Sequence, residues 1–320
     1  MPSGPEEISA ALARLRGGGL VAFPTETVYG LGADAMNPAA IERVFALKGR
    51  PSTNPLIVHV SGEAMARTIV SDWTAEASKL ARAFWPGPLT IVLPKSPRIP
   101  DLVTAGGPTV GVRCPDHHLT LTLIEAFGPL VGPSANPSGR VSPTTAAHVR
   151  ASFDENHVFV LDGGPCRAGI ESTVVALEGS ARVLRPGVIS ADEISAVLAR
   201  PVAPHAPDTI THGVAQSPGQ FASHYAPRTP VRLADRAEII AELRRSIDTT
   251  IVLAISPLES PTPHAVILMP GTAEAYAARL YAALREADEC AATLILIERP
   301  PAAGPVWDAI ADRLRRAAHS

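Results

Sequence analysis

The chain has few of the features that mark secreted, metal-binding or membrane proteins. Its three cysteines, Cys114, Cys166 and Cys290, are odd in number and far apart, so they form neither a disulfide framework nor a metal-ligand spacing. No window approaches the roughly 18 apolar residues that a membrane-spanning helix needs, and no basic, apolar leader opens the sequence. We therefore expect a cytoplasmic protein without membrane contact.

Charge of one sign is also scarce. The formal net charge is −3, so no global basic field draws the chain onto nucleic acid, and any RNA contact would need a local patch. Lysine occurs only at Lys48, Lys79 and Lys95. Hydrophobic residues make up 46% of the 320 residues, which is typical of a globular protein with a substantial core, and the length favours two domains.

Up to about residue 200, short apolar runs alternate with helical patterns. Strands are predicted over residues 20–23, 56–60, 89–93, 110–113, 130–132, 158–161, 173–177 and 182–184. Helix starts are predicted at Asn37 before Pro38, at Asp72, after Asp116, at Ser142 before Pro143, and at Ser190 with Glu193 in a capping box. This alternation predicts an α/β layered domain, and the many short strands favour a mixed sheet.

The organisation changes after residue 200. Residues 201–230 are rich in Pro, Ala, Ser, Gly and His without a sustained period, and they exceed the usual length of a connection. Regular patterns then resume, with strands predicted over 251–255, 265–268 and 293–297 and helices over 238–247, 273–287 and 306–317. The sequence predicts a catalytic domain over 1–203, a linker over 204–230 and a small α/β domain over 231–320.

Polar groups gather where the first predicted strands end. Residues 24–32, Pro-Thr-Glu-Thr-Val-Tyr-Gly-Leu-Gly, follow the first strand, and alone they favour a tight strand-to-loop turn. Lys48, Arg50 and Ser52 then precede a strand that reaches His59. A cation pair of this kind can neutralise phosphates, although spacing alone slightly favours a solvated basic helix end.

Later strands repeat this pattern. Alternation puts Thr109, Gly111 and Arg113 on one face of a strand, and an arginine at a strand end suits a carboxylate ligand. Residues 132–139 end a strand in small hydroxyl and amide groups, either at a ligand site of an α/β sheet or in a polar turn.

Two further segments, residues 169–174 and 184–187, set polar residues against apolar strands. For Arg185 in the second segment, a surface hairpin charge is the alternative to a ligand contact. The sequence has no nucleophile–base dyad, Walker loop or Rossmann fingerprint. The residues therefore indicate a site that binds an anionic ligand and acts by positioning and charge neutralisation.

Taken together, these segments resemble the YrdC-like family of threonylcarbamoyl-AMP synthases, in its long two-domain form. The matching stretches are PTETVYGLG at 24–32, KGRPSTNPLIVHV at 48–60, WPGPLT at 85–90, GVRCP at 111–115, GPSANPSG at 132–139, STV at 172–174 and LRPG at 184–187. The resemblance continues through SPG at 217–219 and HYAP at 224–227, whereas residues 231–320 match only weakly.

The resemblance implies a twisted mixed-sheet YrdC-like catalytic domain and a smaller Rossmann-like α/β C-terminal domain. It also implies an enzyme that condenses L-threonine with bicarbonate to a carbamate, whose oxygen attacks the α-phosphate of ATP and releases pyrophosphate. Mg²⁺ would arrive with the ATP rather than in a protein cage. The product would pass to the tRNA threonylcarbamoyl-transferase machinery for modification of an adenosine, and direct contact with tRNA is left open.

The resemblance further implies roles for individual residues. Lys48 and Arg50 would be the catalytic cations. The ATP-binding set would be Lys48, Arg50, Ser52, Thr109, Ser134, Asn136, Ser142, Arg185 and Tyr225. The threonine-binding set would be Thr25, His59, Arg113 and Ser172. Tyr225, on the linker, would close over the site as a lid and keep water from the carbamate and the adenylate. The middle of this linker lacks the basic residues that the family more often has there.

Two alternatives belong to other functional classes. One is a carbamoyl-transfer enzyme of the hydrogenase-maturation type, which shares a related domain, but this chain lacks that family's acylphosphatase-like and zinc-finger segments. The other is an RNA-binding module, because the related domain has a concave basic face. Pyrophosphate release that depends on threonine and bicarbonate would separate synthesis from binding alone.

Overall fold

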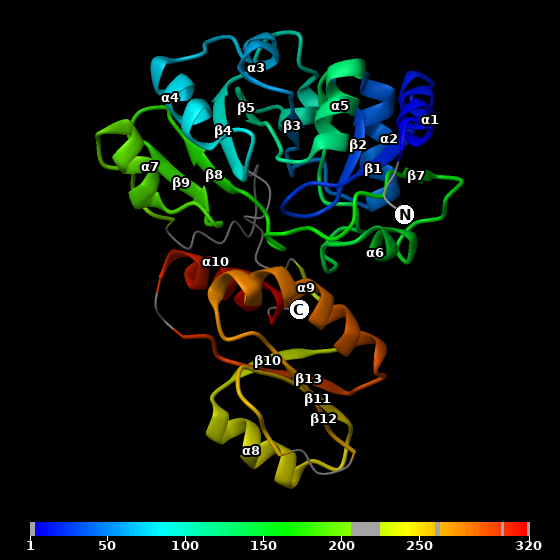
Figure 1. Ribbon diagram of the computed structural model, residues 1–320, viewed down its shortest axis with the longest axis vertical. Coiled ribbons are helices and arrows are strands. Elements are labelled where there is room, and N and C mark those ends of the chain that lie inside the picture. The colour runs from blue at the N-terminus through cyan, green and yellow to red at the C-terminus, as the bar shows by residue number, and fades with distance from the viewer. Residues whose placement is uncertain (1–3, 206–224, 260–262, 302–303, 319–320) are drawn as a thin grey trace.

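Two β-sheets organise the chain. The computed structural model describes residues 4–205, 225–259, 263–301 and 304–318, and within these the larger sheet lies above the smaller one (Figure 1). The linker predicted over 204–230, with its motifs at 217–219 and at His224, falls mainly on residues outside the described part. Within that part, no helix is both long and apolar enough to cross a bilayer.

The larger sheet has nine strands in the order β7-β1-β2-β6-β3-β5-β4-β8-β9. Its strands are β1 (Leu20–Phe23), β2 (Gly30–Asp34), β3 (Ile57–His59), β4 (Leu89–Pro94), β5 (Thr109–Arg113), β6 (Leu130–Val131), β7 (Val158–Val160), β8 (Thr173–Ala176) and β9 (Arg182–Arg185). The pairs β1·β7, β3·β5 and β4·β8 are parallel and the other neighbours antiparallel. The predicted mixed α/β sheet is confirmed.

Helices pack against this sheet and bury its apolar residues. They are α1 (Pro5–Arg16), α2 (Pro38–Lys48), α3 (Glu63–Ile69), α4 (Ala75–Phe84), the 3₁₀ turn η1 (Asp101–Thr104), α5 (His118–Phe127), α6 (Ala146–Arg150) and α7 (Ala191–Leu198). Strand β3 lies at the middle of the sheet, between β6 and β5. The ends of these central strands are therefore surrounded by protein.

Helix caps decide where several helices begin. The Asn37 side chain accepts from the amides of Ala39 and Ala40, at 3.1 and 3.3 Å, which confirms the predicted start of α2. The Ser190 capping box that starts α7 is also confirmed. The predicted cap at Asp72 is wrong, because Thr74 Oγ1 caps α4 instead and accepts from the amide of Ala77 in its first turn.

The predicted helix start at Ser142 is wrong as well. Helix α6 begins at Ala146 and is capped by Thr145. The hydroxyl of Ser142 is buried and donates to the carboxylate of Glu171 instead. The residue therefore belongs to a polar network and not to a helix terminus.

Strand β2 replaces part of the turn that residues 24–32 favoured. Its glycines lie under the ring of Phe23, and a Cβ on Gly30 or Gly32 would come within 2.6 and 2.9 Å of that ring. Glycine is unfavourable in strands, so the local sequence did not indicate a strand here. The glycines are nevertheless needed, because they leave room for the Phe23 ring of the neighbouring strand.

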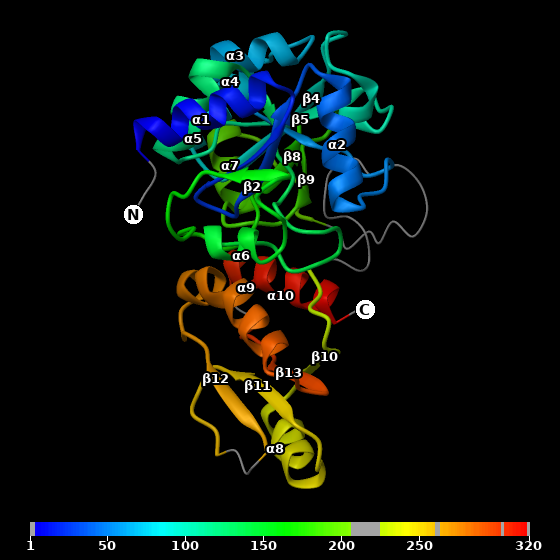
Figure 2. The same cartoon turned by 90° about the vertical axis from the view of Figure 1, so that its right-hand side faces the viewer.

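The smaller sheet is wholly parallel, in the order β10-β13-β11-β12. Its strands are β10 (Val231–Ala234), β11 (Thr250–Ala254), β12 (Ala265–Leu268) and β13 (Leu294–Glu298). Helix α8 (Arg236–Arg245) covers one face, and α9 (Ala273–Glu289) and α10 (Pro305–Ala317) cover the other, which turns toward the larger sheet (Figures 1 and 2). This arrangement agrees with the predicted small α/β unit.

An apolar seam joins the two sheets' helices and loops. Val28, Val141, Ile170 and Tyr225 are buried in one cluster with residues of α9 and α10. At Gly169 the backbone has φ 73°, and a Cβ there would lie 2.3 Å from a carbonyl oxygen of α9. The loop before β8 therefore contacts α9 at a distance that only glycine permits.

Candidate active site

A small cavity of about 50 Å³ lies where the central strands of the larger sheet end. It is lined by Val28, Arg50, Ile57, His59, Arg113, Gly132, Pro133, Ser134, Glu171, Arg185 and Tyr225. Six of these were predicted as site residues from the sequence: Arg50, His59, Arg113, Ser134, Arg185 and Tyr225. Three buried guanidinium groups in so small a cavity suit an anionic ligand.

Arg50 is held by neutral oxygens beyond the end of α2. Its Nε donates to the Asn54 carbonyl at 3.0 Å, and its Nη2 donates to Asn54 Oδ1 and the Pro55 carbonyl, each at 2.7 Å. Burial lowers the pKa of Arg50 to about 9, so at neutral pH the group keeps its charge without a carboxylate in these bonds. Such a cation has unused capacity for an anionic ligand.

Arg185 is oriented by Ser172. Its Nε and Nη2 donate to the Ser172 carbonyl at 3.1 and 3.0 Å, and Nη2 also reaches Ser172 Oγ at 3.1 Å. The same hydroxyl lies 2.8 Å from Thr90 Oγ1. Burial lowers the pKa of Arg185 from its ordinary value. The sequence placed Ser172 beside the threonine, whereas the structure places it behind Arg185, outside the cavity lining.

Arg113 forms a buried ion pair that the sequence analysis missed. Its Nη2 lies 2.8 Å from Glu26 Oε1, and the side chains are 5% and 4% exposed. Nη2 also donates to Thr27 Oγ1 at 2.8 Å. Among the described residues, Arg113 Nε has no hydrogen-bond partner. The available signal was a carboxylate inside an otherwise uncharged segment, residues 24–32.

His59 lies beside Arg113 in the register of β3 and β5. Burial, and then the charge of Arg113, hold the pKa of His59 well below its usual range, so the ring is neutral at physiological pH. Its Nδ1 has no hydrogen-bond partner within the described part of the chain. The ring packs edge-on against Phe23 with centroids 5.3 Å apart. A neutral imidazole there can accept from or donate to a ligand hydroxyl or amine.

Thr25 fixes the loop after β1 and does not line the cavity. Its hydroxyl donates to the Val28 carbonyl at 2.7 Å and accepts from the amides of Thr27 and Val28 at 3.1 and 3.2 Å. These bonds hold Val28 against the cavity and Thr27 against Arg113. Thr25 therefore acts on the site through its neighbours.

Lys48 and Asn136 lie behind the cavity wall. Lys48 Nζ donates to the carbonyls of Ser134 and Asn136, and burial lowers the pKa of Lys48 well below its ordinary value. Asn136 Nδ2 donates to the carbonyls of Pro137 and Arg140, each at 2.8 Å. Both side chains hold the loop that presents Ser134.

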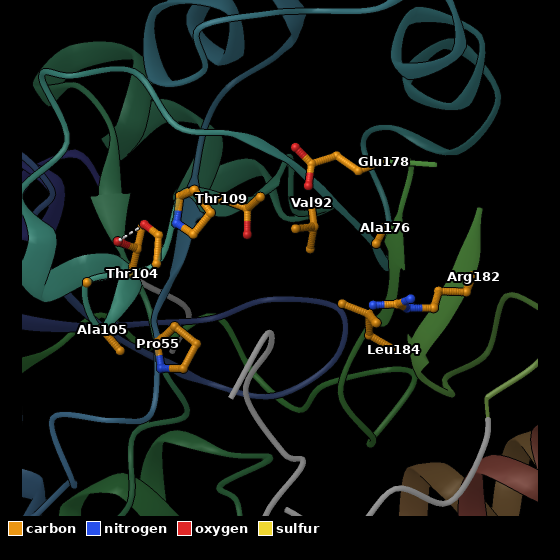
Figure 3. Close-up of a pocket in the computed structure, with 12 residues that line it drawn as sticks. Pro55, Val92, Thr104, Ala105, Thr109, Ala176, Glu178, Arg182 and Leu184 are labelled. Carbon is orange, nitrogen blue, oxygen red and sulfur yellow. Dashed lines mark hydrogen bonds between the residues drawn. The ribbon is translucent and has the colours of Figure 1, made fainter. Parts of the chain in front are cut away.

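Three predicted ATP ligands lie elsewhere. Ser52 is exposed in the loop after α2, and Ser142 belongs to the network around Glu171. Thr109 lines a second cavity of about 340 Å³, with Pro55 and Leu184 (Figure 3). The Pro55 carbonyl accepts from Arg50, and Leu184 precedes Arg185. The second cavity therefore adjoins the arginines of the first.

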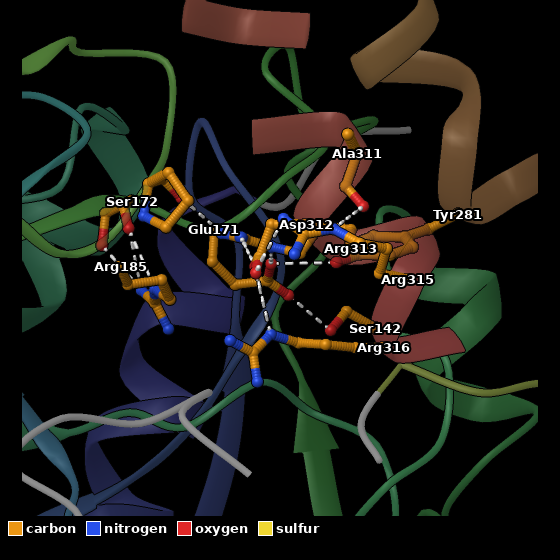
Figure 4. A network of polar contacts seen from close by, with 11 residues as sticks. Ser142, Glu171, Ser172, Arg185, Tyr281, Ala311, Asp312, Arg313, Arg315 and Arg316 are labelled. Atoms are coloured by element: carbon orange, nitrogen blue, oxygen red, sulfur yellow. Dashed lines mark hydrogen bonds and ion pairs between the residues drawn. The ribbon is translucent and has the colours of Figure 1, made fainter. Parts of the chain in front are cut away.

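Glu171 connects the cavity to the smaller domain (Figure 4). Its Oε1 accepts from Ser142 at 2.7 Å, and its Oε2 accepts from Tyr281 of α9 and Arg313 of α10, each at 2.9 Å. Burial raises its pKa, but Arg313, Arg185 and the hydrogen bonds outweigh burial and hold the pKa below its ordinary value. Glu171 is therefore an ionised, buried carboxylate.

Tyr225 closes the cavity from the side of the smaller domain. Its backbone has φ 66°, and the next amide, of Ala226, donates to the Gly139 carbonyl at 2.8 Å. The ring stacks on Tyr281 with centroids 5.7 Å apart, and the Arg313 guanidinium carbon lies 5.4 Å from the ring centroid. The side chain is 1% exposed.

Fold and site together define a two-domain α/β protein whose anion site lies at central strand ends. Family models agree. The Sua5/YciO/YrdC model, described as telomere recombination, matches residues 13–187. The model for the threonylcarbamoyl-AMP synthase C-terminal domain matches residues 189–319. The chain belongs to the Sua5/YciO/YrdC family.

Individual relatives match over nearly the whole chain. A Pyrococcus abyssi protein named threonylcarbamoyl-AMP synthase is 39% identical over 97% of this chain and 94% of its own length. A Bacillus subtilis protein of the same name is 38% identical over 98% and 93%. The solved structure of P. abyssi Sua5 complexed with L-threonine superposes with a TM-score of 0.90 at 38% identity, covering 99% of this chain and 96% of the other.

Proposed function

We propose that the chain is a threonylcarbamoyl-AMP synthase that converts L-threonine, bicarbonate and ATP into threonylcarbamoyl-AMP and pyrophosphate. The observation that carries the proposal is the similarity, across both domains, to two proteins of that name. The cavity suits this reaction because each substrate carries an anionic group, and Arg50, Arg113 and Arg185 line the cavity together. Neither the hydrogenase-maturation nor the RNA-binding alternative accounts for similarity over both domains.

The chemistry needs positioning more than a protein nucleophile. The threonine amine attacks the bicarbonate carbon, water leaves, and a carbamate forms. A carbamate oxygen then attacks the α-phosphorus of ATP, and the bond to pyrophosphate breaks. The phosphates carry negative charge during the attack and during the release of pyrophosphate. Buried cations held by neutral oxygens, such as Arg50, can stabilise this charge because no carboxylate already neutralises them.

The threonine site is assigned to the side of the cavity that holds Arg113 and His59. Arg113 Nε is an unused donor that suits the carboxylate, and the neutral His59 ring suits the amine or hydroxyl. The P. abyssi relative has been solved with L-threonine bound, which supports a threonine site in this fold. Thr25 and Ser172 contribute through the Val28 loop and through Arg185.

ATP is assigned to the arginines on the other side. Arg50 and Arg185 would hold the phosphates, and Thr109 in the adjoining cavity would contact the nucleoside. Ser134 lines the cavity, while Lys48 and Asn136 hold its loop. Tyr225 would keep water from the carbamate.

We propose that Mg²⁺ enters with ATP. In the described residues, no three His, Cys, Asp or Glu side chains lie together in a group that could hold a metal. The arginines that line the cavity cannot ligate Mg²⁺, but they can bind the phosphate oxygens that carry it, and the ion would supply additional charge neutralisation. We further propose that the product passes, in the cytoplasm, to the machinery that modifies tRNA.

The test is pyrophosphate release by the unmodified chain with ATP and Mg²⁺. Release should require both threonine and bicarbonate, and omitting either should abolish it. Arg113→Lys should raise the KM for threonine, because lysine cannot reproduce the fork of a guanidinium. Arg98→Lys, at an exposed arginine, is the matched control and should leave the KM unchanged. Release that does not depend on threonine would exclude the proposed function.

A further inference from the structure

The smaller domain contributes two side chains to the back of the cavity wall. Tyr281 of α9 and Arg313 of α10 each donate to Oε2 of Glu171, whose side chain lines the cavity. The separations along the chain are 110 and 142 residues, so these are contacts between domains. The smaller domain therefore fixes the position of a carboxylate that lines the cavity.

Glu171 places a negative charge in a cavity that would bind negatively charged phosphates. It is the single acidic residue among the described lining residues, next to the arginines that would bind phosphates. An ionised carboxylate in a poorly solvated cavity repels a triphosphate unless a cation compensates it. Ser142 and Tyr281 donate hydrogen bonds but carry no charge. Charge compensation must therefore come from arginine.

Arg313 is positioned to compensate the charge of Glu171. Its side chain is 1% exposed and lies 2.9 Å from the Glu171 carboxylate. The guanidinium is fixed from behind, because Nη1 donates to Asp312 at 2.8 Å and Nη2 to the Pro186 carbonyl at 2.9 Å. Arg316 pairs with the same aspartate at 3.1 Å. Arg313 would therefore keep a counter-charge if Glu171 lost its own.

Close packing sets the register of this contact. Gly169, two residues before Glu171, approaches α9 so closely that a Cβ would lie 2.4 Å from Ala278 Cα. The ring of Tyr225 stacks on Tyr281 and lies under Arg313 (Figure 4 shows Arg313, Tyr281 and Glu171). The carboxylate, the tyrosines and the arginine thus form one buried unit spanning both domains.

We propose that the C-terminal domain completes the active site electrostatically: Arg313, supported by Tyr281, neutralises Glu171 so that the cavity accepts the phosphates of ATP. The inference rests on the proposed function for its ligand. Arg313 and Tyr281 are positioning residues, since both act through Glu171. Removing Arg313 leaves the carboxylate to be offset by Arg185 alone, whose charge is then less available to ATP, whereas removing the charge of Glu171 makes Arg313 dispensable.

The experiment measures ATP affinity by calorimetry, with Mg²⁺ and without threonine, on full-length variants. Arg313→Met should weaken ATP binding about ten- to a hundredfold, the range for the loss of one charge-assisted hydrogen bond. Glu171→Gln should bind ATP at least as tightly as the unmodified chain. The double variant should recover to within about threefold of it. A purely structural role for Arg313 would give no such rescue.

Arg285→Met is the matched control. Arg285 lies on α9, beside the α10 helix of Arg313, and likewise donates across the domains, to the Val141 carbonyl at 2.5 Å, but none of its hydrogen bonds goes to Glu171. Its ATP affinity should stay within about twofold of the unmodified chain, because only a neutral oxygen loses a donor. A loss equal to that of Arg313→Met would assign the effect to domain docking and overturn the proposal.

Each of the other possible outcomes also supports or overturns the proposal. If the double variant binds ATP as weakly as Arg313→Met, charge is not the cause and the proposal is wrong. If Arg313→Met does not fold, Glu171→Gln decides alone: a tenfold or greater loss of ATP affinity, roughly the loss of one charged hydrogen bond, overturns the proposal. The predicted affinity pattern in a chain that releases no threonine-dependent pyrophosphate would uphold this inference and refute the proposed function. Normal synthesis without the pattern would do the reverse.

Discussion

Replacing Glu26 with glutamine would remove the charged partner of Arg113 and leave the surrounding shape almost unchanged. The pair is 2.8 Å apart, with side chains 5% and 4% exposed. Glu26 Oε2 also accepts from the Asp116 amide at 3.1 Å. Glutamine has a single acceptor oxygen, so it can accept from only one of these two donors, and it cannot balance the charge of the arginine. The variant therefore removes the charge of this ion pair together with one acceptor oxygen.

The expected size of the effect follows from burial. Breaking a buried ion pair by removing one partner costs about 3–5 kcal/mol, and we take the lower end because glutamine retains one of the two hydrogen bonds. In a domain of about 200 residues, about 3 kcal/mol corresponds to a fall in Tm of roughly 6–12 °C. Threonine should raise the Tm of Glu26→Gln more than that of the unmodified chain, since its carboxylate would become the counter-charge of Arg113.

Scanning fluorimetry with and without threonine checks this prediction. Glu155→Gln is the control, because Glu155 pairs with Arg150 at 3.5 Å on the surface, with side chains 77% and 42% exposed. Such surface pairs contribute about 0–1 kcal/mol, so its Tm should fall by no more than about 4 °C. Equal Tm values for the two variants would refute the argument that Arg113 depends on a buried counter-charge.

Three further predictions concern ATP, substrate choice and pH. Lys48→Ala and Arg50→Ala should each lower ATP affinity about ten- to a hundredfold in calorimetry, through the Ser134 loop and the phosphate contact respectively. Unchanged affinity in both folded variants would contradict it. Threonine should be turned over in preference to valine in the pyrophosphate assay, because a site that bonds a hydroxyl is left with unpaired groups by the isostere, and equal rates would exclude this. Burial lowers the pKa of His148 to about 4, so the unfolded chain binds a proton near pH 6.5 that the folded chain refuses. Stability should fall as pH drops from 7 to 5, and less in His148→Asn, which keeps an acceptor for the Thr144 amide; identical pH profiles would contradict that assignment.

Much of the fold could be predicted because its signals are local. The apolar run at residues 20–23 matches β1 without error, and the cap at Asn37 places the start of α2. Strand β2 could not be recognised, since its glycines are explained only by the ring of Phe23 from the neighbouring strand. The predicted helix cap was wrong where two candidate capping residues lay close together, as with Asp72 and Thr74.

The site divides in the same way. Arg113 and Arg185 are the last residues of their strands and Arg50 precedes β3, so their convergence at strand ends could be anticipated. The partners that tune them could not, because Glu171 and Arg313 meet across 142 residues and across two domains. The residue pattern of one segment does not predict which charged residue of a distant segment will pair with it. A buried acidic residue in a motif rich in small and apolar residues is the one local hint that was available.

The proposed function requires that threonine, bicarbonate and ATP combine into a single adenylate with release of pyrophosphate. The most direct test supplies the unmodified chain with ¹³C-bicarbonate, threonine, ATP and Mg²⁺, and analyses the nucleotide products by mass spectrometry. We expect an AMP adduct that contains both threonine and the ¹³C label, formed together with pyrophosphate. ADP and phosphate as products, or an AMP product without threonine and the label, would contradict it.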